Sequence, residues 1–245
     1  MQTSTAQSSL RSAVALERGD KVTRLEAFVD AAFAFSVTLL VVSGDHIPTS
    51  IAQLILAMKT IPAYAASFLM IMTFWNSHVR WSRRYGLDDT ASQRLSLLLV
   101  FLVLIFVYPV KMVFATLFDA LSGGYLPANF KIGSLAELPA MFVTFGVAFG
   151  LMGATMLALY CHAWRQRDAL ALTLDERAAT LLDLCVWATV PLVAIVSIVL
   201  ALLIPAREES GWWLGAPGFV FFSLNVVRFG LPGQIARWRR KQEAA

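Results

Sequence analysis

Long, uninterrupted apolar stretches dominate the chain and predict helices that cross a bilayer. A membrane-spanning helix needs about 20 predominantly apolar residues, and several stretches reach that length. Their apolar residues are continuous, whereas a strand of a membrane β-barrel alternates apolar and polar residues over about 10 positions. The predicted fold is therefore all-α, a polytopic membrane protein with six transmembrane helices, at residues 22–42, 51–79, 95–118, 138–164, 178–204 and 212–229.

Basic residues fall on alternate sides of this predicted bundle. The connections assigned to one side hold only Lys131 and Arg207. Because Lys and Arg are enriched in cytoplasmic loops, the opposite side is predicted to be cytoplasmic, together with the N- and C-termini. The basic residues on that side are Arg11, Arg18, Lys21, Arg24, Arg80, Arg83, Arg84, Arg94, Arg165, Arg167, Arg177, Arg228, Arg237, Arg239, Arg240 and Lys241.

Composition agrees with a membrane protein. The chain is 58% hydrophobic and 15% charged, against about 45–50% and about 25% in soluble domains. The net charge of +4 is accounted for by basic residues beside membrane ends, so membrane lipid, and not nucleic acid, is the expected partner. The predicted organisation is a mobile N-terminal tail at 1–19, a transmembrane domain at 20–232 and a basic tail at 233–245.

The sequence lacks the patterns of common enzyme classes. Its three histidines, His46, His78 and His162, are scattered, and its two cysteines, Cys161 and Cys185, fall on the predicted cytoplasmic side. Neither a Walker loop nor a Gly-x-Ser-x-Gly, His-Glu-x-x-His or dinucleotide-binding motif is present. We expect no enzymatic activity, no metal site and no cofactor.

The first predicted helix carries a carboxylate that needs an explanation. A charged residue at the centre of a spanning helix costs roughly 2.5–3.5 kcal/mol on insertion scales, yet Asp30 lies more than one turn inside the stretch. At ~100° per residue, Asp30 lies ~140° around the helix from Phe35. The carboxylate must therefore face different surroundings from the stripe formed by Phe35, Thr38, Leu39 and Val42, which follows i, i+3, i+4, i+7 spacing.

Two interpretations of that stripe remain open on spacing alone. It can line a pore with a single hydroxyl, from Thr38, among apolar side chains, or it can pack against lipid and protein. Asp30, in turn, needs hydrogen-bond donors or a cation. Trp75 and His78 share one face near the end of the second predicted helix, and their ring N–H groups can donate to a carboxylate.

These residues resemble a known family. The string Arg24-x-x-x-Phe28-Val29-Asp30 resembles the Arg-x-x-x-Phe-Ser-Asp signature of the transmembrane protein 175 family, the endosomal, lysosomal and bacterial potassium channels. The Trp75-x-x-His78 pair is similar to that family's aromatic residue and His at the end of helix two, and Tyr108-Pro109 resembles its proline-containing third helix. The resemblance extends over about residues 24–109, and the second half of the chain agrees in helix count.

The resemblance implies a potassium-selective or cation-leak channel of the bacterial plasma membrane. It implies a homotetramer in which four copies of helix one surround a pore for monovalent cations, with potassium as the permeant ion. Phe35, Leu39 and Val42 would then form the hydrophobic constrictions, and Thr38 would contribute to selectivity. The implied structural network that holds helix one consists of Arg24, Phe28, Asp30, Trp75 and His78.

The sequence departs from the family pattern at three positions. Val29 replaces the motif Ser, Phe35 stands where Ile or Leu is expected, and Ser96 stands where the third helix commonly begins with Asn-Leu. Two alternatives therefore accompany the channel. A proton-coupled secondary transporter would use intramembrane ionisable residues such as Asp30 and Lys111, and a non-conducting membrane scaffold would follow if Phe35 occludes the axis. Gly146-x-x-x-Gly150 with Gly153 is expected to be a packing surface in any of these cases.

Overall fold

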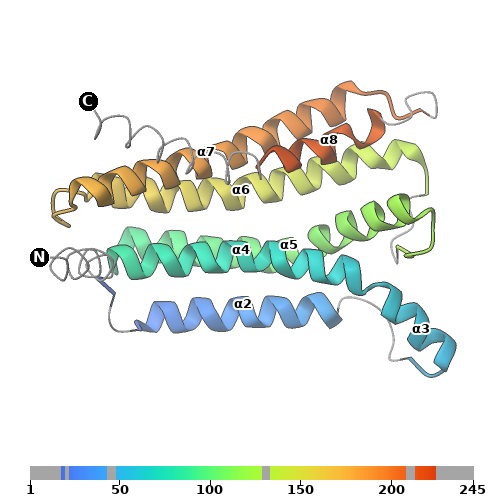
Figure 1. Cartoon of the computed structure of the whole chain (residues 1–245), viewed down its shortest axis with the longest axis horizontal. Coiled ribbons are helices and arrows are strands. Elements are labelled where there is room, and N and C mark those ends of the chain that lie inside the picture. The colour runs from blue at the N-terminus through green and yellow to red at the C-terminus, as the bar shows by residue number, and fades with distance from the viewer. Residues whose placement is uncertain (1–17, 20–21, 43–47, 129–132, 208–212, 225–245) are drawn as a thin grey trace, which may run out of the picture.

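The computed structural model describes residues 18–19, 22–42, 48–128, 133–207 and 213–224, and the regular elements in these ranges are all helices. They stack in layers, with α2 on one side, α4 and α5 in the middle, and α6, α7 and α8 on the other side (Figure 1). In chain order the elements are α2 (Arg24–Val42), α3 (Ile51–Lys59), α4 (Ile61–Tyr85), α5 (Thr90–Ser122), the 3-10 turn η1 (Leu135–Glu137), α6 (Leu138–Arg165), α7 (Leu174–Leu203), α8 (Ala216–Phe219) and the 3-10 turn η3 (Val220–Phe222).

The helices have the length and apolarity of a membrane bundle. Within the described ranges, α5, α6 with η1, and α7 are each long and apolar enough to cross a membrane, and α3 with α4 qualifies as one bent pair. The predicted all-α class is confirmed. The first predicted span corresponds to α2, and a short apolar helix at 213–222 is the described part of the sixth. The count of six spans and the cytoplasmic placement of the termini stay predictions.

The second predicted span is not one continuous helix. Thr60 ends α3 and begins α4, and the two helices meet at a bend of 42°. Pro62 explains the break, because proline lacks the N–H for an intrahelical bond and its ring clashes with the carbonyl of Met58. At the end of α3 the Lys59 ammonium lies 4.0 Å from the centroid of the Tyr125 ring, a cation–π contact that gives this basic residue a partner.

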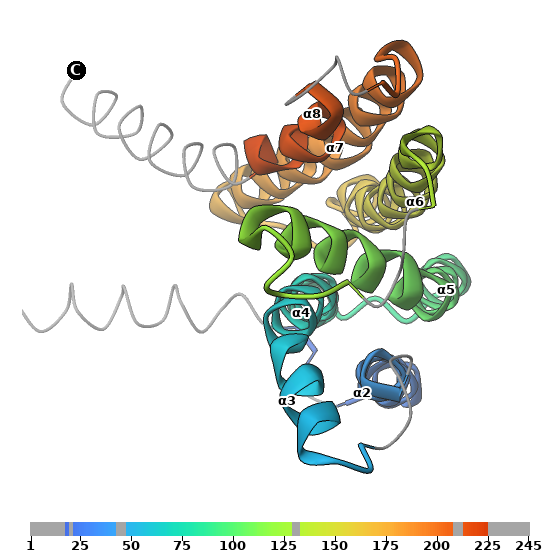
Figure 2. The ribbon, with the colours of Figure 1, turned by 90° about the vertical axis from the view of Figure 1, so that its right-hand side faces the viewer.

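Helix α5, which corresponds to the third predicted span, extends beyond the predicted apolar run at both ends. Asp89 begins α5 by accepting the backbone N–H of Ser92 at 3.2 Å, a standard N-cap interaction. Pro109 lies inside the helix, and Figure 2 shows that the part of α5 after its middle runs in another direction from the first part. A proline in the helix interior causes this kind of kink. Gly123 ends α5 with a φ of 61°, a left-handed conformation that glycine adopts without strain.

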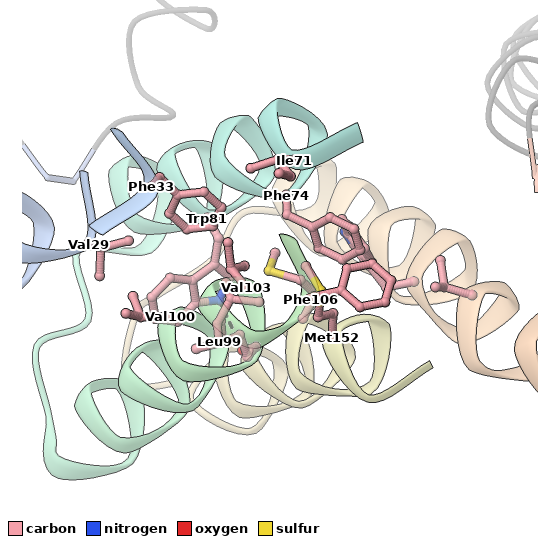
Figure 3. Close-up of a cluster of buried hydrophobic side chains, with 14 of the residues drawn as sticks. Val29, Phe33, Ile71, Phe74, Trp81, Leu99, Val100, Val103, Phe106 and Met152 are labelled. Carbon is pink, nitrogen blue, oxygen red and sulfur yellow. Dashed lines mark hydrogen bonds between the residues drawn. The ribbon is translucent and has the colours of Figure 1, made fainter. Parts of the chain in front are cut away.

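The core lies between the layers. Figure 3 shows Val29 and Phe33 of α2 in one cluster with Phe74 of α4 and Phe106 of α5. Farther along, Phe149 of α6 continues the cluster, and its ring centroid is 5.5 Å from that of Phe74 in an edge-to-face contact. Such aromatic pairs add about 0.5–1.5 kcal/mol to the contribution of buried area. Helix α2 is thus attached to the rest of the chain through its own buried residues.

One end of the bundle gathers most of the described arginines. We call it the basic end, where α2, α5 and α7 begin and α4 and α6 end, and it contains Arg80, Arg83, Arg84, Arg94, Arg165, Arg167 and Arg177. Hydrogen bonds tie the helices together there. The Trp81 indole donates to the Leu159 carbonyl at 3.0 Å, and the hydroxyls of Tyr85 and Thr180 are 2.7 Å apart.

The predicted N-terminal tail includes two described residues, and both are docked on the basic end. The backbone N–H groups of Arg18 and Gly19 donate to the Arg83 carbonyl at 2.9 and 3.0 Å. The Arg18 side chain forms a two-pronged ion pair with the buried Glu176, at 2.7 and 3.1 Å. The segment before α2 thereby bridges α4 and α7.

Helices α6 and α7 approach closely through glycines of α6. A Cβ added to Gly146 would lie 2.7 Å from Ile198 Cγ1, one added to Gly150 would lie 3.0 Å from Ala194 Cβ, and one added to Gly153 would lie 2.7 Å from Val190 Cβ. Small residues at helix interfaces let backbones come near enough for extensive van der Waals contact. The expected packing surface is therefore present.

We predict that Gly153→Ala destabilises the protein by about 1–3 kcal/mol, the typical cost of forcing extra atoms into a packed interface. Gly150→Ala should destabilise the protein less, because its added methyl meets a single atom, Ala194 Cβ at 3.0 Å, and a shift of a few tenths of an ångström relieves that tight contact. Unfolding titrations in detergent would measure both.

A double-mutant cycle provides the control for this prediction. Val190→Ala keeps Cβ but removes Cγ1, the Val190 atom nearest to the new methyl, so Gly153→Ala should destabilise the protein less in the Val190→Ala background than in the wild type. Equal costs in the two backgrounds would show that these residues do not limit the approach of α6 and α7.

Candidate functional site

Helix α2 presents two different faces. Its buried face consists of Val29, Phe33, Ser36 and Leu40, each at most 1% exposed. These residues follow i, i+4, i+7, i+11 spacing, which places them on one side of a helix. Since α2 packs against α4 and α5, the buried face is the centre of the contact between α2 and the rest of its own chain.

The other face is open and has a regular pattern of its own. We call it the α2 stripe, and it consists of Arg24, Phe28, Ala31, Phe35 and Thr38, all exposed in the single chain. Phe28 is 54% exposed and Phe35 is 56% exposed. Steps of four and three residues alternate along the stripe, which is the 3.5-residue repeat of helices that pack along their length against other helices.

The stripe contains two of the four residues predicted to line a pore. Phe35 and Thr38 point away from the chain's own core, whereas Leu39 is partly buried and packs against that core. Val42 is the last residue of α2, and its side chain lies outside the described part of the structure. The open face is therefore shifted from the predicted one toward Ala31 and Phe28.

The Thr38 hydroxyl has a defined orientation. It donates a hydrogen bond to the Ala34 carbonyl one turn earlier, at 3.2 Å. A threonine hydroxyl has one hydrogen and two acceptor lone pairs. Because the hydrogen is directed along the helix, the oxygen's remaining acceptor capacity is available to the open side of α2.

The structure brings Asp30 and Trp75 together, as the sequence suggested. The Trp75 indole Nε1 donates to Asp30 Oδ1 at 2.8 Å. A hydrogen bond to an ionised acceptor contributes more than one between neutral groups. The bond joins α2 to α4 on the side of α2 away from Phe35, in agreement with the expected difference between the surroundings of the carboxylate and of the stripe.

The rest of the predicted network is arranged differently within one chain. His78 is buried, and its Nε2 lies 2.9 Å from the Ser96 hydroxyl of α5 instead of bonding to Asp30. Arg24 and Phe28 belong to the α2 stripe and are exposed in the single chain, on a different side of α2 from Asp30. The physical reason is helical phase. Arg24 and Phe28 lie eleven and seven residues before Phe35, within ~20° of it at ~100° per residue.

A second carboxylate at the start of α2 was not expected from the sequence. Glu26 and Thr23 form reciprocal bonds, in which Thr23 N donates to Glu26 Oε2 at 2.8 Å and Glu26 N donates to Thr23 Oγ1 at 3.1 Å. Glu26 also accepts the hydroxyl of Ser82 from α4. The Thr-x-x-Glu spacing is the signature of a capping box, so this residue pair could have been identified as the start of the helix.

The described residues include no group of three or more His, Cys, Asp or Glu placed to hold a metal ion. The polar side chains around α2 instead bond to one another and to the helix backbone. The available chemistry is that of a surface with aromatic rings, one hydroxyl oxygen and a basic end.

Comparison with known proteins gives this arrangement a context. The model of the family described as "Endosomal/lysosomal potassium channel TMEM175" matches residues 24–109. A protein of Marivirga tractuosa named "Potassium channel" is 28% identical over 189 residues, which covers 73% of this chain and 75% of that protein. These names are those of ion channels and not of enzymes.

Two solved structures share the fold. The potassium channel MtTMEM175, crystallised as a threonine-to-alanine variant with a nanobody–MBP fusion, superposes with a TM-score of 0.75 at 23% identity, covering 90% of this chain and 96% of that one. A homologue of the lysosomal potassium-selective channel TMEM175 from Chamaesiphon minutus has a TM-score of 0.51 at 21% identity, covering 82% and 97%. The matched segment begins at Arg24, the first residue of α2, and ends at Pro109 within α5. Residues 24–109 of this chain therefore match the model of the TMEM175 potassium channel family, and the chain shares its fold with two solved TMEM175 structures.

Proposed function

We propose that the chain forms a homotetrameric potassium channel in a bacterial plasma membrane, with α2 from each copy around the conduction axis. The observation that carries this proposal is the α2 stripe. It leaves Phe35, more than half exposed, and Thr38 on the open side of a helix whose opposite side is fully buried. A 3.5-residue repeat on an open helix face suits contact with other helices, and the related proteins are potassium channels.

The proposed pore has six spans per copy, with α2 first and the segment that begins at 213 last. Phe35 forms the hydrophobic constriction at the level of the stripe, and Leu39 and Val42 border it one and two turns onward. Apolar rings can stop ions by excluding water from a narrow passage. Potassium and other monovalent cations pass by diffusion, so no cofactor takes part.

Thr38 supplies the polar group next to this constriction. With its hydrogen donated to Ala34, the hydroxyl oxygen can replace part of the water around a cation. Oxygen ligands that substitute for hydration are the general basis of potassium selection. In this proposal Thr38 favours potassium over sodium, and Phe35 sets how easily either ion passes.

The polar contacts at the basic end position α2. Asp30 is held by Trp75 of its own chain, yet the carboxylate stays exposed there, as does Arg24. In the tetramer, Arg24 of one copy is proposed to approach Asp30 of a neighbouring copy. The network inferred from the sequence would then be completed between copies, with Trp75 orienting the carboxylate.

Potassium, sodium and proton flux into liposomes that contain the pure protein would test the function directly. Passive flux with potassium ahead of sodium is expected, together with a tetramer by light scattering in mild detergent. A saturable flux coupled to protons would support the transporter alternative, and absence of flux would support the scaffold.

We predict that Asp30→Ala and Arg24→Ala lower the yield or the melting temperature of the tetramer more than they change ion selectivity. Each substitution leaves a charged partner without its counterpart, which costs several kcal/mol where the site is buried. Asp88→Ala and Arg94→Ala are matched controls, because both residues are exposed near the basic end and lie off α2. Wild-type stability with altered selectivity would instead place Arg24 and Asp30 in the ion path.

We predict that Phe35→Ala increases cation flux by about tenfold or more, since loss of about 1.4 kcal/mol from a barrier raises a rate tenfold. Leu39→Ala should increase flux less because Leu39 is partly buried against its own chain. Phe101→Ala is the matched control, as Phe101 of α5 is similarly exposed at 59%. The role of Phe35 is wrong if Phe35→Ala leaves flux unchanged and cysteines at positions 35, 38 and 39 do not react with small thiol reagents from either side.

We predict that Thr38→Ala reduces the preference for potassium over sodium while total cation flux is maintained. The substitution deletes the one hydroxyl on the α2 stripe without adding bulk. Thr144→Ala is the control, because the exposed Thr144 hydroxyl also donates to the carbonyl one turn earlier, Ala140 at 2.8 Å, but on α6. Bi-ionic potentials across a planar bilayer give the ratio, and equal ratios for wild type and Thr38→Ala would remove Thr38 from ion selection.

A further inference from the structure

A cavity of about 550 Å³ lies between α4 and α7, away from the α2 stripe. Much of its lining is apolar or aromatic and comes from four elements, including Phe74 of α4, Phe149 of α6, Trp187 of α7 and Phe221 of η3. The last described residue, Leu224, also contributes. Away from the basic end the polar lining consists of Thr73 and Thr189, whose hydroxyls donate to carbonyls of their own helices. This part of the cavity suits a hydrocarbon chain better than water, because few polar groups are present to hydrogen-bond with water.

The charged residues of this cavity gather where it reaches the basic end. Arg80 and Arg84 of α4 line it together with Asp183 of α7. Arg84 is engaged, with Nη1 only 2.5 Å from Asp183 Oδ2. Arg80 is exposed, donates to the Ser77 hydroxyl at 3.1 Å, and forms no ion pair with any carboxylate in the described ranges. Two arginines and one carboxylate leave this end of the cavity with net positive charge.

We propose that the cavity binds an anionic phospholipid, whose phosphate lies against Arg80 and Ser77 and whose acyl chain extends along Phe74 and Trp187. The charges match, since arginine donates to phosphate oxygens in a geometry suited to two hydrogen bonds. The location also matches, because basic pockets between membrane helices on the cytoplasmic side are a recurring type of lipid headgroup site. This inference uses the membrane placement of the proposed function, with the basic end cytoplasmic, and does not depend on ion conduction.

The chain's own C-terminal segment is a less suitable occupant. The sequence after Leu224 carries Arg228, Arg237, Arg239 and Arg240. Bringing those cations beside Arg80 would be electrostatically unfavourable, whereas a phosphate would neutralise the positive charge of Arg80. The acyl chain of the lipid would also contact the apolar side chains that line the cavity away from Arg80.

Tryptophan quenching by brominated lipids tests the proposal in the intact protein. Trp187 lines the cavity and is 7% exposed, so the difference in fluorescence between wild type and Trp187→Phe isolates its signal. In vesicles with brominated acyl chains, we expect that signal to be quenched more by phosphatidylglycerol than by phosphatidylcholine. Arg80→Gln should reduce the preference by about fivefold, which corresponds to about 1 kcal/mol.

Arg94→Gln is the matched control, because it removes an exposed arginine at the same end of the bundle without touching the cavity. Native mass spectrometry gives a second readout that does not require the Trp187→Phe variant, namely phosphatidylglycerol retained per subunit by Arg80→Gln and by Arg94→Gln. The proposal is overturned if the two lipids quench Trp187 equally, if neither quenches it, or if Arg80→Gln keeps the wild-type preference. Competition by glycerol phosphate alone, at concentrations that displace the lipid, would show a phosphate site without an acyl-chain requirement and would also overturn it.

Potassium flux measured in the same vesicles separates this inference from the proposed channel. Flux in pure phosphatidylcholine together with absence of lipid preference would support the channel and reject the lipid site. Lipid preference without flux would support the lipid site and reject the channel.

Discussion

The central constraint on this structure is that α2 has two faces with different surroundings, one packed against its own chain and one exposed. Its buried residues hold it against α4 and α5, and the residues of the α2 stripe repeat every 3.5 positions on the opposite side. Because side chains on one helix face are fixed in phase, neither set can move without the other. The Asp30–Trp75 bond lies between these faces and fixes the rotation of α2 about its own axis. Any role for Phe35 and Thr38 depends on that rotation.

The remainder of the chain supplies a rigid support for this helix. Helices α6 and α7 meet through glycines that allow their backbones to approach. On the other side of the core, aromatic rings from α4, α5 and α6 interlock around Phe149. Close-packed interiors deform little, so α4 and α5 present a fixed surface to α2.

Much of this arrangement could be predicted from the sequence, for identifiable physical reasons. Apolar length predicted the helices, and the cost of an intramembrane carboxylate pointed to Asp30 and to a ring N–H as its partner. The break at Thr60 was missed because hydropathy does not register the steric effect of Pro62. Arg24 and Phe28 were grouped with Asp30 on the family resemblance, which does not register that their helical phase places them with Phe35 on the exposed side of the single chain. His78 could not be assigned to Ser96 from the sequence, since that contact depends on how α4 and α5 pack.

The direction of the Thr38 hydroxyl has a further consequence for a tetrameric pore. With its hydrogen committed to the Ala34 carbonyl, each threonine of the proposed tetramer would offer the axis an oxygen and no proton. A ring of such oxygens would attract cations and repel anions without carrying any net charge. Discrimination by the sign of the ion would then be independent of protonation, unlike discrimination by a ring of carboxylates, and would persist in acidic surroundings.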